Sequence, residues 1–302
     1  MNGTVGSTYQ SNADVHISKE GFYLGKTNAY GFIGDLGSYS KNNFNIAFFG
    51  DSFTEAFQLF EPYNFTSITE IKLNKVQSTK VDVLNFGISN VLLKDIYIRK
   101  KMLASKFDID LNVYFVDNIQ FVDYPEGVLN SLDLKIEKEK IQVVESKSSS
   151  YLLYQKIHFL VDKSSYTNLF LDLYLLHKRG LAYQNIFDKF IQNKGSTIFD
   201  TRIVSENMFE NMPMINSKIL AELAKENTVF IFKETIDPDV EKLLLKHQIL
   251  FFETKPTLDS MRDSGMNPYY WERTQTMGHF NYVAHEKLAS FMTGIILPCV
   301  KK

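Results

Sequence analysis

The chain has 302 residues, 44% of them hydrophobic and 23% charged, which is the composition of a soluble globular protein. This length suffices for one large α/β domain or two smaller ones. The 33 basic and 35 acidic residues give a formal net charge of −2, so there is no basic field to attract nucleic acid or an anionic membrane. Nucleic-acid binding is therefore not indicated.

The single cysteine, Cys299, cannot form an internal disulfide, and this leaves the cellular compartment open. A cytoplasmic protein fits the chain as it stands, and an exported or anchored protein fits if a leading segment has been removed. The N-terminus lacks the basic and apolar regions of a signal peptide, and no stretch reaches the roughly 18 apolar residues of a membrane span. We expect no membrane span in this chain, and its oligomeric state stays open.

Residues 1–43 are rich in Gly, Ser, Asn and Tyr, and glycines separate short aromatic pieces. This pattern predicts an N-terminal extension that is disordered at its start and continues with turns and short strands. The main domain is expected to begin at residue 44 and to run to residue 302.

From residue 44 onward, short apolar runs alternate with segments of helical spacing. Strands are expected at 46–49, 81–86, 111–116, 228–232 and 249–252. Helices are expected at about 53–78, 92–106 and 216–225, and again after Asp237-Pro238. Five strands that alternate with helices predict an α/β three-layer sandwich around a five-stranded parallel sheet, with the flavodoxin-like strand order 2-1-3-4-5.

The long segment at about 121–213 is predicted to be a helical insertion that covers or shapes the substrate cleft. A charged helix is expected at 133–147 and a second helix at 151–160, with more helix through His177 and Phe190. His158 and His177 are interpreted as ordinary helix-face histidines, because neither has a second ligand type at metal spacing. No metal site and no cofactor are expected.

Polar residues follow the predicted strands where chemistry is expected. The apolar run 46–49 ends at Gly50, and Asp51-Ser52 then precedes a helix start. Ser52 would thus stand at the carboxyl end of a strand with its backbone N–H at a helix N-terminus, as a nucleophile requires. Gly87 closes the second strand, where the absence of a Cβ would let the backbone approach a ligand. Asn118 follows the third strand.

The motif Gly50–Glu55 (Gly-Asp-Ser-Phe-Thr-Glu), followed in order by Gly87, Asn118 and His279, resembles the SGNH, or GDSL-like, hydrolase superfamily. The resemblance implies that Ser52 is the nucleophile and His279 its base, with Asp51 in support. It also implies an oxyanion hole made by the backbone N–H groups of Ser52 and Gly87 and the side-chain amide of Asn118. Residues 28–32 are similar to an extension in SGNH proteins that act on cell-surface saccharides.

His285, which opens the last helix, is interpreted as a packing residue. The resemblance has two departures. In the first, Val116 and Ile119 flank Asn118 where the family has glycine and aspartate. Thr276 and Met277 occupy the place of the aspartate that normally supports the catalytic histidine. Candidates to replace that aspartate nearby in sequence are Glu272, Asp263 and Asp259, and a backbone carbonyl behind a Ser-His dyad is equally possible.

The leading hypothesis is a serine esterase or O-acyltransferase that removes or transfers an O-acyl group, in particular acetyl, on a carbohydrate or small-molecule ester through an acyl-enzyme. The alternative is a degenerate SGNH domain that binds a glycan or a protein without turnover. A nucleotide or phosphate binder is disfavoured, because no glycine-rich phosphate motif follows a strand.

Overall fold

The structure is a computed structural model that describes residues 8–18, 20–34, 39–122, 131–161, 163–178 and 213–300. The chain divides into two compact units, one formed by residues 1–122 with 199–302 and the other by residues 123–198. Residues 1–7, at the start of the N-terminal extension that is expected to be disordered, and the far end of the helix expected through His177 and Phe190 lie outside the described residues.

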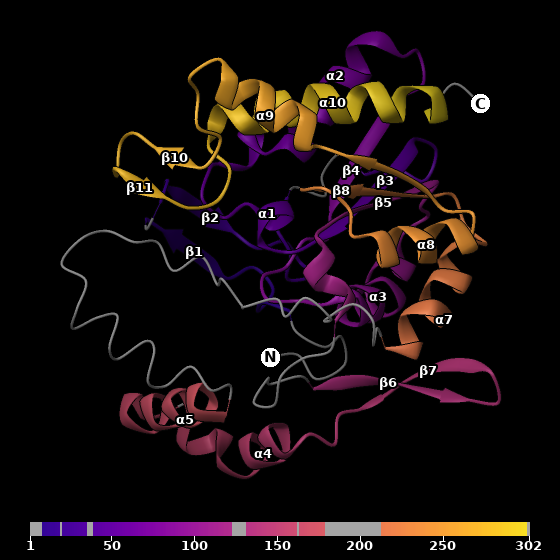
Figure 1. Ribbon diagram of the computed structural model, residues 1–302. Helices are drawn as coiled ribbons and strands as arrows, with labels where there is room; N and C mark the ends of the chain where they lie inside the picture. Colours follow the sequence, from indigo (N-terminus) through magenta and orange to yellow (C-terminus); the bar gives the residue numbers. More distant parts are fainter. Residues whose placement is uncertain are drawn as a thin grey trace. The chain divides into compact units, whose positions relative to one another are not determined.

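The first unit is built on a parallel sheet of five strands (Figure 1). In chain order these are β3 (Phe44–Gly50), β4 (Val81–Asn85), β5 (Leu111–Val116), β8 (Thr228–Phe232) and β9 (Leu250–Glu253). They lie in the order β4-β3-β5-β8-β9, and every pairing is parallel. The predicted order 2-1-3-4-5 is confirmed. Because β3 lies between β4 and β5, the residues that follow β3 emerge between the ends of two neighbouring strands.

Helices cover both faces of the sheet (Figure 1). One face carries α2 (Phe65–Val76), α9 (Lys255–Asp263) and α10 (Tyr282–Val300), and the other carries α3 (Leu93–Met102), α7 (Met214–Leu223) and α8 (Pro238–Lys246). Single turns occur at α1 (Ser52–Glu55), η1 (Glu61–Tyr63), η2 (Ala104–Lys106) and η3 (Asn118–Phe121). The α/β three-layer architecture is thus confirmed.

The core of the sheet is strongly aromatic on both sides of β3. Side chains alternate between the two faces along a strand, so Ile46 and Phe48 join the cluster beneath α2 and α10. Phe49 stacks with Phe86 and Tyr114 at centroid distances of 5.3 and 5.0 Å. Both faces of β3 are therefore held in place immediately before the Ser52 turn.

Helix α10 is the one described helix that is long and apolar enough to cross a membrane, judged by length and composition only. In the first unit Leu288, Met292 and Ile296 are fully buried in the cluster of the central sheet. These positions follow helical spacing, so packing against the sheet accounts for the apolar character of this helix.

The N-terminal residues form an antiparallel hairpin of β1 (Asp14–Ile17) and β2 (Tyr23–Lys26), as expected from the short strands predicted there. The rings of Tyr9 and Tyr23 pack against Phe57 at 5.1 and 5.4 Å between centroids. A second small hairpin, β10 (Tyr270–Trp271) with β11 (Thr276–Met277), precedes α10. It was not predicted.

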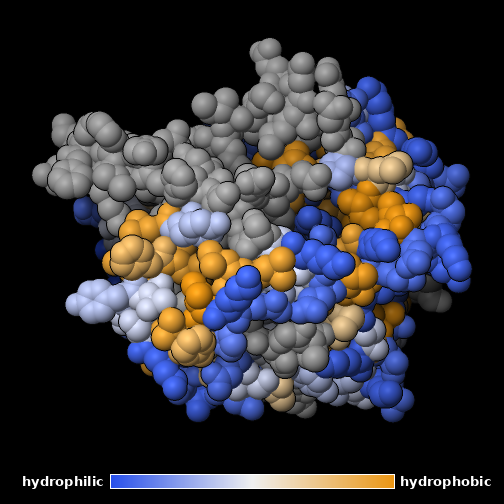
Figure 2. Space-filling model, turned by 90° about the horizontal axis from the view of Figure 1, so that it is seen from below, coloured by the Kyte–Doolittle hydropathy of each residue, from blue (hydrophilic) through white to orange (hydrophobic). Residues whose placement is uncertain are grey.

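The second unit contains β6 (Leu132–Glu137), β7 (Lys140–Glu145), α4 (Ser149–Val161) and α5 (Ser165–Lys178). The prediction of a helix over 133–147 is wrong, because β6 and β7 form an antiparallel hairpin there. Lys138 and Glu139 make its turn with φ values of 47° and 65°, as a two-residue type I′ turn requires. The helix predicted at 151–160 is confirmed by α4. The side chains of Tyr166 and Phe170 on α5 are largely exposed. Hydrophobic residues also lie among hydrophilic ones on the face of the molecule that Figure 2 shows.

Candidate active site

Ser52 is the first residue of α1 and follows closely after β3, as predicted. Asp51 caps α1, and its Oδ1 accepts a hydrogen bond from the backbone N–H of Phe53 at 3.0 Å. A Cβ on Gly50 would lie 2.1 Å from Thr54 Oγ1 and 2.3 Å from Phe115 O. Only glycine therefore lets the chain turn this tightly between the sheet and α1.

The other oxygen of Asp51 ties this turn to neighbouring strands. Asp51 Oδ2 accepts hydrogen bonds from Gln120 Nε2 at 3.0 Å and from Lys233 Nζ at 2.7 Å. Gln120 follows β5 and Lys233 follows β8, so the ends of three strands meet at this carboxylate. The predicted supporting role of Asp51 stays a prediction, and the geometry gives it a means, because Asp51 fixes the turn that carries Ser52.

Lys233 is a buried cation within this group. Its Nζ lies 3.7 Å from a carboxylate oxygen of Asp117 and 4.2 Å from the ring centroid of Phe53. Burial alone would lower the pKa of Lys233, but the nearby carboxylates of Asp51 and Asp117 outweigh it and raise the pKa. The ammonium group therefore stays charged and neutralises one of the two carboxylates.

Ser52 and His279 are 227 positions apart in the chain, and the structure brings them into hydrogen-bond contact. Ser52 Oγ lies 2.8 Å from His279 Nε2, and the ring of Phe53 packs against the imidazole at 4.6 Å between centroids. On the far side of the imidazole, Glu20 Oε2 lies 2.9 Å from His279 Nδ1 and accepts from the His279 backbone N–H at 2.7 Å. An ionised carboxylate can only accept, so it places the proton on Nδ1 and leaves Nε2 free to accept from Ser52.

Glu20 was not among the sequence candidates. It belongs to the N-terminal segment, 259 positions from His279. Its backbone carbonyl accepts a hydrogen bond from Thr274 Oγ1 at 2.7 Å. A Cβ on Gly278 would lie 2.2 Å from Glu20 Cδ, so the glycine before His279 makes room for this carboxylate. The pair Gly278-His279 was visible in the sequence, but nothing there identified the group that packs against it.

The three acids proposed from sequence lie elsewhere. Glu272 is exposed, and Asp259 pairs with Lys255 and Arg262 on α9. Asp263, the last residue of α9, is exposed as well. The expectation that Glu272 supports the histidine is corrected by the position of Glu20. The preference for an acid close in sequence failed because the N-terminal hairpin folds back onto the β10–β11 region.

The two other predicted oxyanion donors have intramolecular partners. The Gly87 backbone N–H donates to Asn85 Oδ1 at 2.9 Å. The Asn118 amide donates to Thr235 O at 2.8 Å and accepts from Asp237 N–H at 2.9 Å, which fastens the loop before α8. No described residue accepts from the Ser52 backbone N–H. The oxyanion role of Gly87 and Asn118 stays a prediction, and it requires these bonds to be shared or released.

Two further buried groups lie near the Ser52 turn. Burial raises the pKa of Glu55. Hydrogen bonds from Ser89 and Tyr9 and the positive charge of Arg99 act in the opposite direction. Arg99 is buried as well, which lowers its pKa to about 10. This network joins the N-terminal segment to α1 and to the loop after β4.

His285 is a buried packing residue, which agrees with its interpretation from the sequence. Its Nδ1 accepts a hydrogen bond from the Phe65 backbone N–H at 3.0 Å, and burial followed by the charge of His279 lowers its pKa to about 3. His285 is therefore neutral at ordinary pH. Within the described ranges, no group of three or more His, Cys, Asp or Glu side chains could hold a metal ion.

No protein-family model matches this sequence, and a comparison with curated proteins finds no match. Solved structures do match in fold. A lipase/acylhydrolase from Enterococcus faecalis has 12% identity and a TM-score of 0.40, over 84% of this chain and 96% of that one. An alpha/beta hydrolase from the metagenome of Lake Arreo, Spain, has 12% identity and a TM-score of 0.43, over 88% of this chain and 100% of that one.

An acetyl xylan esterase from Geobacillus stearothermophilus has 12% identity and a TM-score of 0.42, over 86% of this chain and 97% of that one. The matching solved structures thus include proteins described as a lipase/acylhydrolase, an acetyl xylan esterase and a putative lipolytic protein of the G-D-S-L family. At these identities and TM-scores the likeness assigns no role to individual side chains.

Proposed function

We propose that this protein is a serine esterase of the SGNH type. The observation that carries the proposal is the continuous line of hydrogen bonds from Ser52 Oγ through the His279 imidazole to the Glu20 carboxylate, at 2.8 and 2.9 Å. Nucleophile, base and orienting group are recognised by such geometry rather than by their order in the sequence. Here the acid precedes the nucleophile, and the base comes last.

In the proposed reaction Ser52 Oγ attacks the ester carbonyl while its proton passes to His279 Nε2. The C–O bond to the leaving alcohol then breaks, and that alcohol takes the proton from the imidazolium. An acyl group remains on Ser52, and water or an acceptor hydroxyl removes it with His279 again acting as base. Glu20 keeps the ring in the productive tautomer and balances the charge of the imidazolium.

The tetrahedral oxyanion needs hydrogen-bond donors close to Ser52. The Ser52 N–H at the start of α1 is the donor we assign first, because no described residue uses it. Gly87 is the second, once its N–H turns from Asn85 Oδ1 toward the substrate. Each such donor typically contributes about 10²–10³ in rate.

For the substrate we propose an O-acyl, in particular O-acetyl, group on a carbohydrate or a small alcohol. Two observations support this choice: the motif resemblance to saccharide-associated SGNH proteins, and the fold likeness to a protein described as an acetyl xylan esterase. Hydrolysis and transfer share the acyl-enzyme and differ only in whether water or a sugar hydroxyl accepts the acyl group.

A second candidate is a catalytically degenerate domain that binds a glycan or a protein. The intramolecular partners of Gly87 N–H and the Asn118 amide favour it, because an oxyanion hole with a single donor is weak. The presence of Glu20 behind His279 favours the enzyme, because a binding domain has no need for an oriented imidazole.

The test is hydrolysis of p-nitrophenyl acetate by the purified protein. We expect turnover that is lost in Ser52→Ala and in His279→Ala but kept in the matched controls Ser105→Ala and His16→Ala, whose side chains are exposed. Equal activity in the wild type and in folded Ser52→Ala would show that Ser52 is not the nucleophile. A folded wild type that hydrolyses neither this ester nor acetylated xylo-oligosaccharides would support the binding domain.

A further inference from the structure

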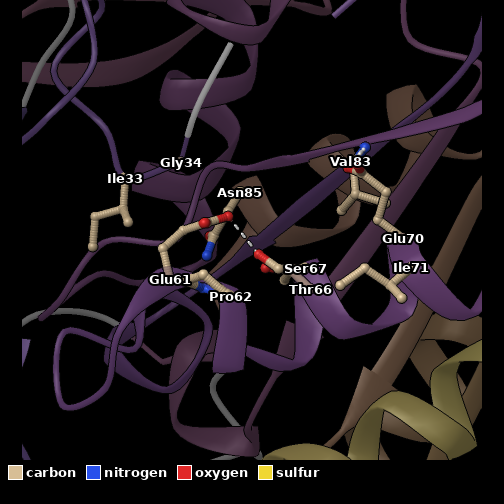
Figure 3. Close-up of a pocket in the computed structure, with 10 residues that line it drawn as sticks. All are labelled: Ile33, Gly34, Glu61, Pro62, Thr66, Ser67, Glu70, Ile71, Val83 and Asn85. Carbon is tan, nitrogen blue, oxygen red and sulfur yellow. Dashed lines mark hydrogen bonds between the residues drawn. The ribbon is translucent and has the colours of Figure 1, made fainter. Parts of the chain in front are cut away.

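A cavity of about 220 Å³ opens at the edge of the sheet, between the start of α2, strand β4 and residues 33–34 of the N-terminal segment (Figure 3). Its polar wall consists of Glu61, Thr66, Ser67, Glu70 and Asn85. Ser52, His279 and Glu20 are not among its lining residues, so this cavity is distinct from the candidate active site. It is smaller than a typical drug-sized pocket of roughly 300–1,000 Å³, which suits a ligand of about one sugar ring.

Two carboxylates give this cavity a negative character. Glu61 accepts from Ser67 Oγ at 2.6 Å, and Glu70 accepts from the Val83 backbone N–H at 2.8 Å. No described residue donates to the second oxygen of either group. No basic side chain lines the cavity, and burial together with the charges of Asp82 and Glu61 raises the pKa of Glu70. Lys80, whose charge acts in the opposite sense, is not among the lining residues.

Thr66 provides an independent sign of a missing partner. Only 2% of this residue is exposed, it lines the cavity, and no described residue forms a hydrogen bond with its hydroxyl group. Buried polar side chains are normally paired, so an unpaired hydroxyl at a cavity wall indicates a ligand or solvent partner. Asn85 is different, because its amide is occupied by Thr54 O and Gly87 N–H.

We propose that this cavity binds a small molecule that carries a protonated amine beside hydroxyl groups, in the manner of an amino sugar. The ammonium group donates to the second oxygen of one of the two carboxylates in the field of the other, and a neighbouring hydroxyl pairs with Thr66. A neutral sugar leaves the two carboxylates without a countercharge, and an anion is repelled by them. No bond is made or broken, so the inference stands apart from the proposed esterase activity.

The test is titration of the wild-type protein with D-glucosamine at neutral pH, followed by calorimetry or saturation-transfer NMR. We expect saturable binding with a Kd in the millimolar range, and binding of N-acetylglucosamine weaker by about tenfold or more, because acetylation removes the charge. Glu61→Gln and Glu70→Gln should each weaken glucosamine binding by about tenfold, and Thr66→Val by about threefold. Glu137→Gln, an exposed change in β6, should leave it unaltered.

Three results would each overturn the proposal: no saturation up to about 50 mM glucosamine, equal binding of glucosamine and its N-acetyl derivative, or unchanged binding in both glutamine variants. If either glutamine variant is unfolded, the comparison of the two sugars on the wild type still decides, because it requires no substitution. Loss of esterase activity in Ser52→Ala has no bearing on this binding, so failure of one proposal is distinguishable from failure of the other.

Discussion

Replacing Glu20 by glutamine removes the negative charge behind His279 while keeping a side chain of the same size. Glu20 Oε2 lies 2.9 Å from His279 Nδ1, and the carboxylate and imidazole side chains are only 11% and 25% exposed. A carboxylate and an imidazolium about 4 Å apart attract by about 4 kcal/mol at an effective dielectric constant of about 20. Because the imidazolium forms only during reaction, this energy is lost from the transition state.

At 1.36 kcal/mol for each factor of ten, we expect kcat to fall by about a thousandfold, with about 10⁴ as the limit known for the aspartate of a serine protease. KM should change by less than about threefold, because the ground-state substrate does not contact Glu20. The assay is steady-state hydrolysis of p-nitrophenyl acetate by the wild type, Glu20→Gln and the exposed control Glu137→Gln, with thermal unfolding of each protein. A folded Glu20→Gln variant whose kcat stays within about tenfold of the wild type would refute the reasoning.

Three further outcomes follow from the contacts described above. Gly278→Ala places a Cβ 2.2 Å from Glu20 Cδ and should lower kcat by about 10²-fold, whereas Gly294→Ala, with nothing within 4 Å, should not; equal kinetics of the two would contradict this. The pKa of His285 is about 3 in the folded protein, against an ordinary value of 6.5. Below pH 6.5 the unfolded chain therefore binds a proton at His285 that the native state does not bind. As a result, the free energy of unfolding falls as the pH falls. Urea titrations at pH 7, 6, 5 and 4 should show a weaker pH dependence in His285→Gln, by about 0.7 kcal/mol between pH 7 and 6 and by about 1.3 kcal/mol for each pH unit below 6. Identical slopes would argue against the neutral buried imidazole. Lys233→Met leaves two carboxylates without their buried cation and should cost about 3–5 kcal/mol in urea unfolding at pH 7, so a loss below about 1 kcal/mol would show that the ion pair is dispensable.

The sheet was predictable because its strands are nearly uninterrupted apolar runs that end at turn residues. β3 and β5 are buried on both faces, and such strands stand out in a sequence. The positions of Ser52 and His279 were predictable for a related reason, because both belong to short motifs. Ser52 follows the end of β3, and His279 precedes the last helix. Local pattern and local structure agree at these places.

The remaining features depend on contacts that no local pattern carries. Thr274 donates a hydrogen bond to the backbone carbonyl of Glu20, and the absence of a side chain at Gly278 leaves room for the Glu20 carboxylate. Both residues are more than 250 positions from Glu20 in the chain. The β6–β7 hairpin was mistaken for a helix because its exposed face is charged and its turn, Lys138-Glu139, contains neither glycine nor asparagine. Period-two alternation of Leu134 and Ile136 was the signal available there.

Asn118 shows the limit of carrying a family role onto one position. An asparagine after β5 matched the motif, but its amide caps the loop that leads into α8. The altered neighbours Val116 and Ile119 were the sequence features that pointed to this difference. If the amide is released to reach the oxyanion of the tetrahedral intermediate, Asn118→Ala should lose about 10²-fold in kcat, and an unchanged kcat would limit Asn118 to its structural role.

The most direct measurement of the central claim is intact-mass spectrometry after incubation with a fluorophosphonate, with peptide mapping of the adduct. An activated serine reacts with this reagent, and a serine without a base does not. We predict one adduct on Ser52 in the wild type, none in Ser52→Ala, and labelling slowed by about 10²-fold or more in His279→Ala. A folded wild type that takes up no label, or an adduct that persists in Ser52→Ala, would contradict the assignment of Ser52 and His279 as nucleophile and base.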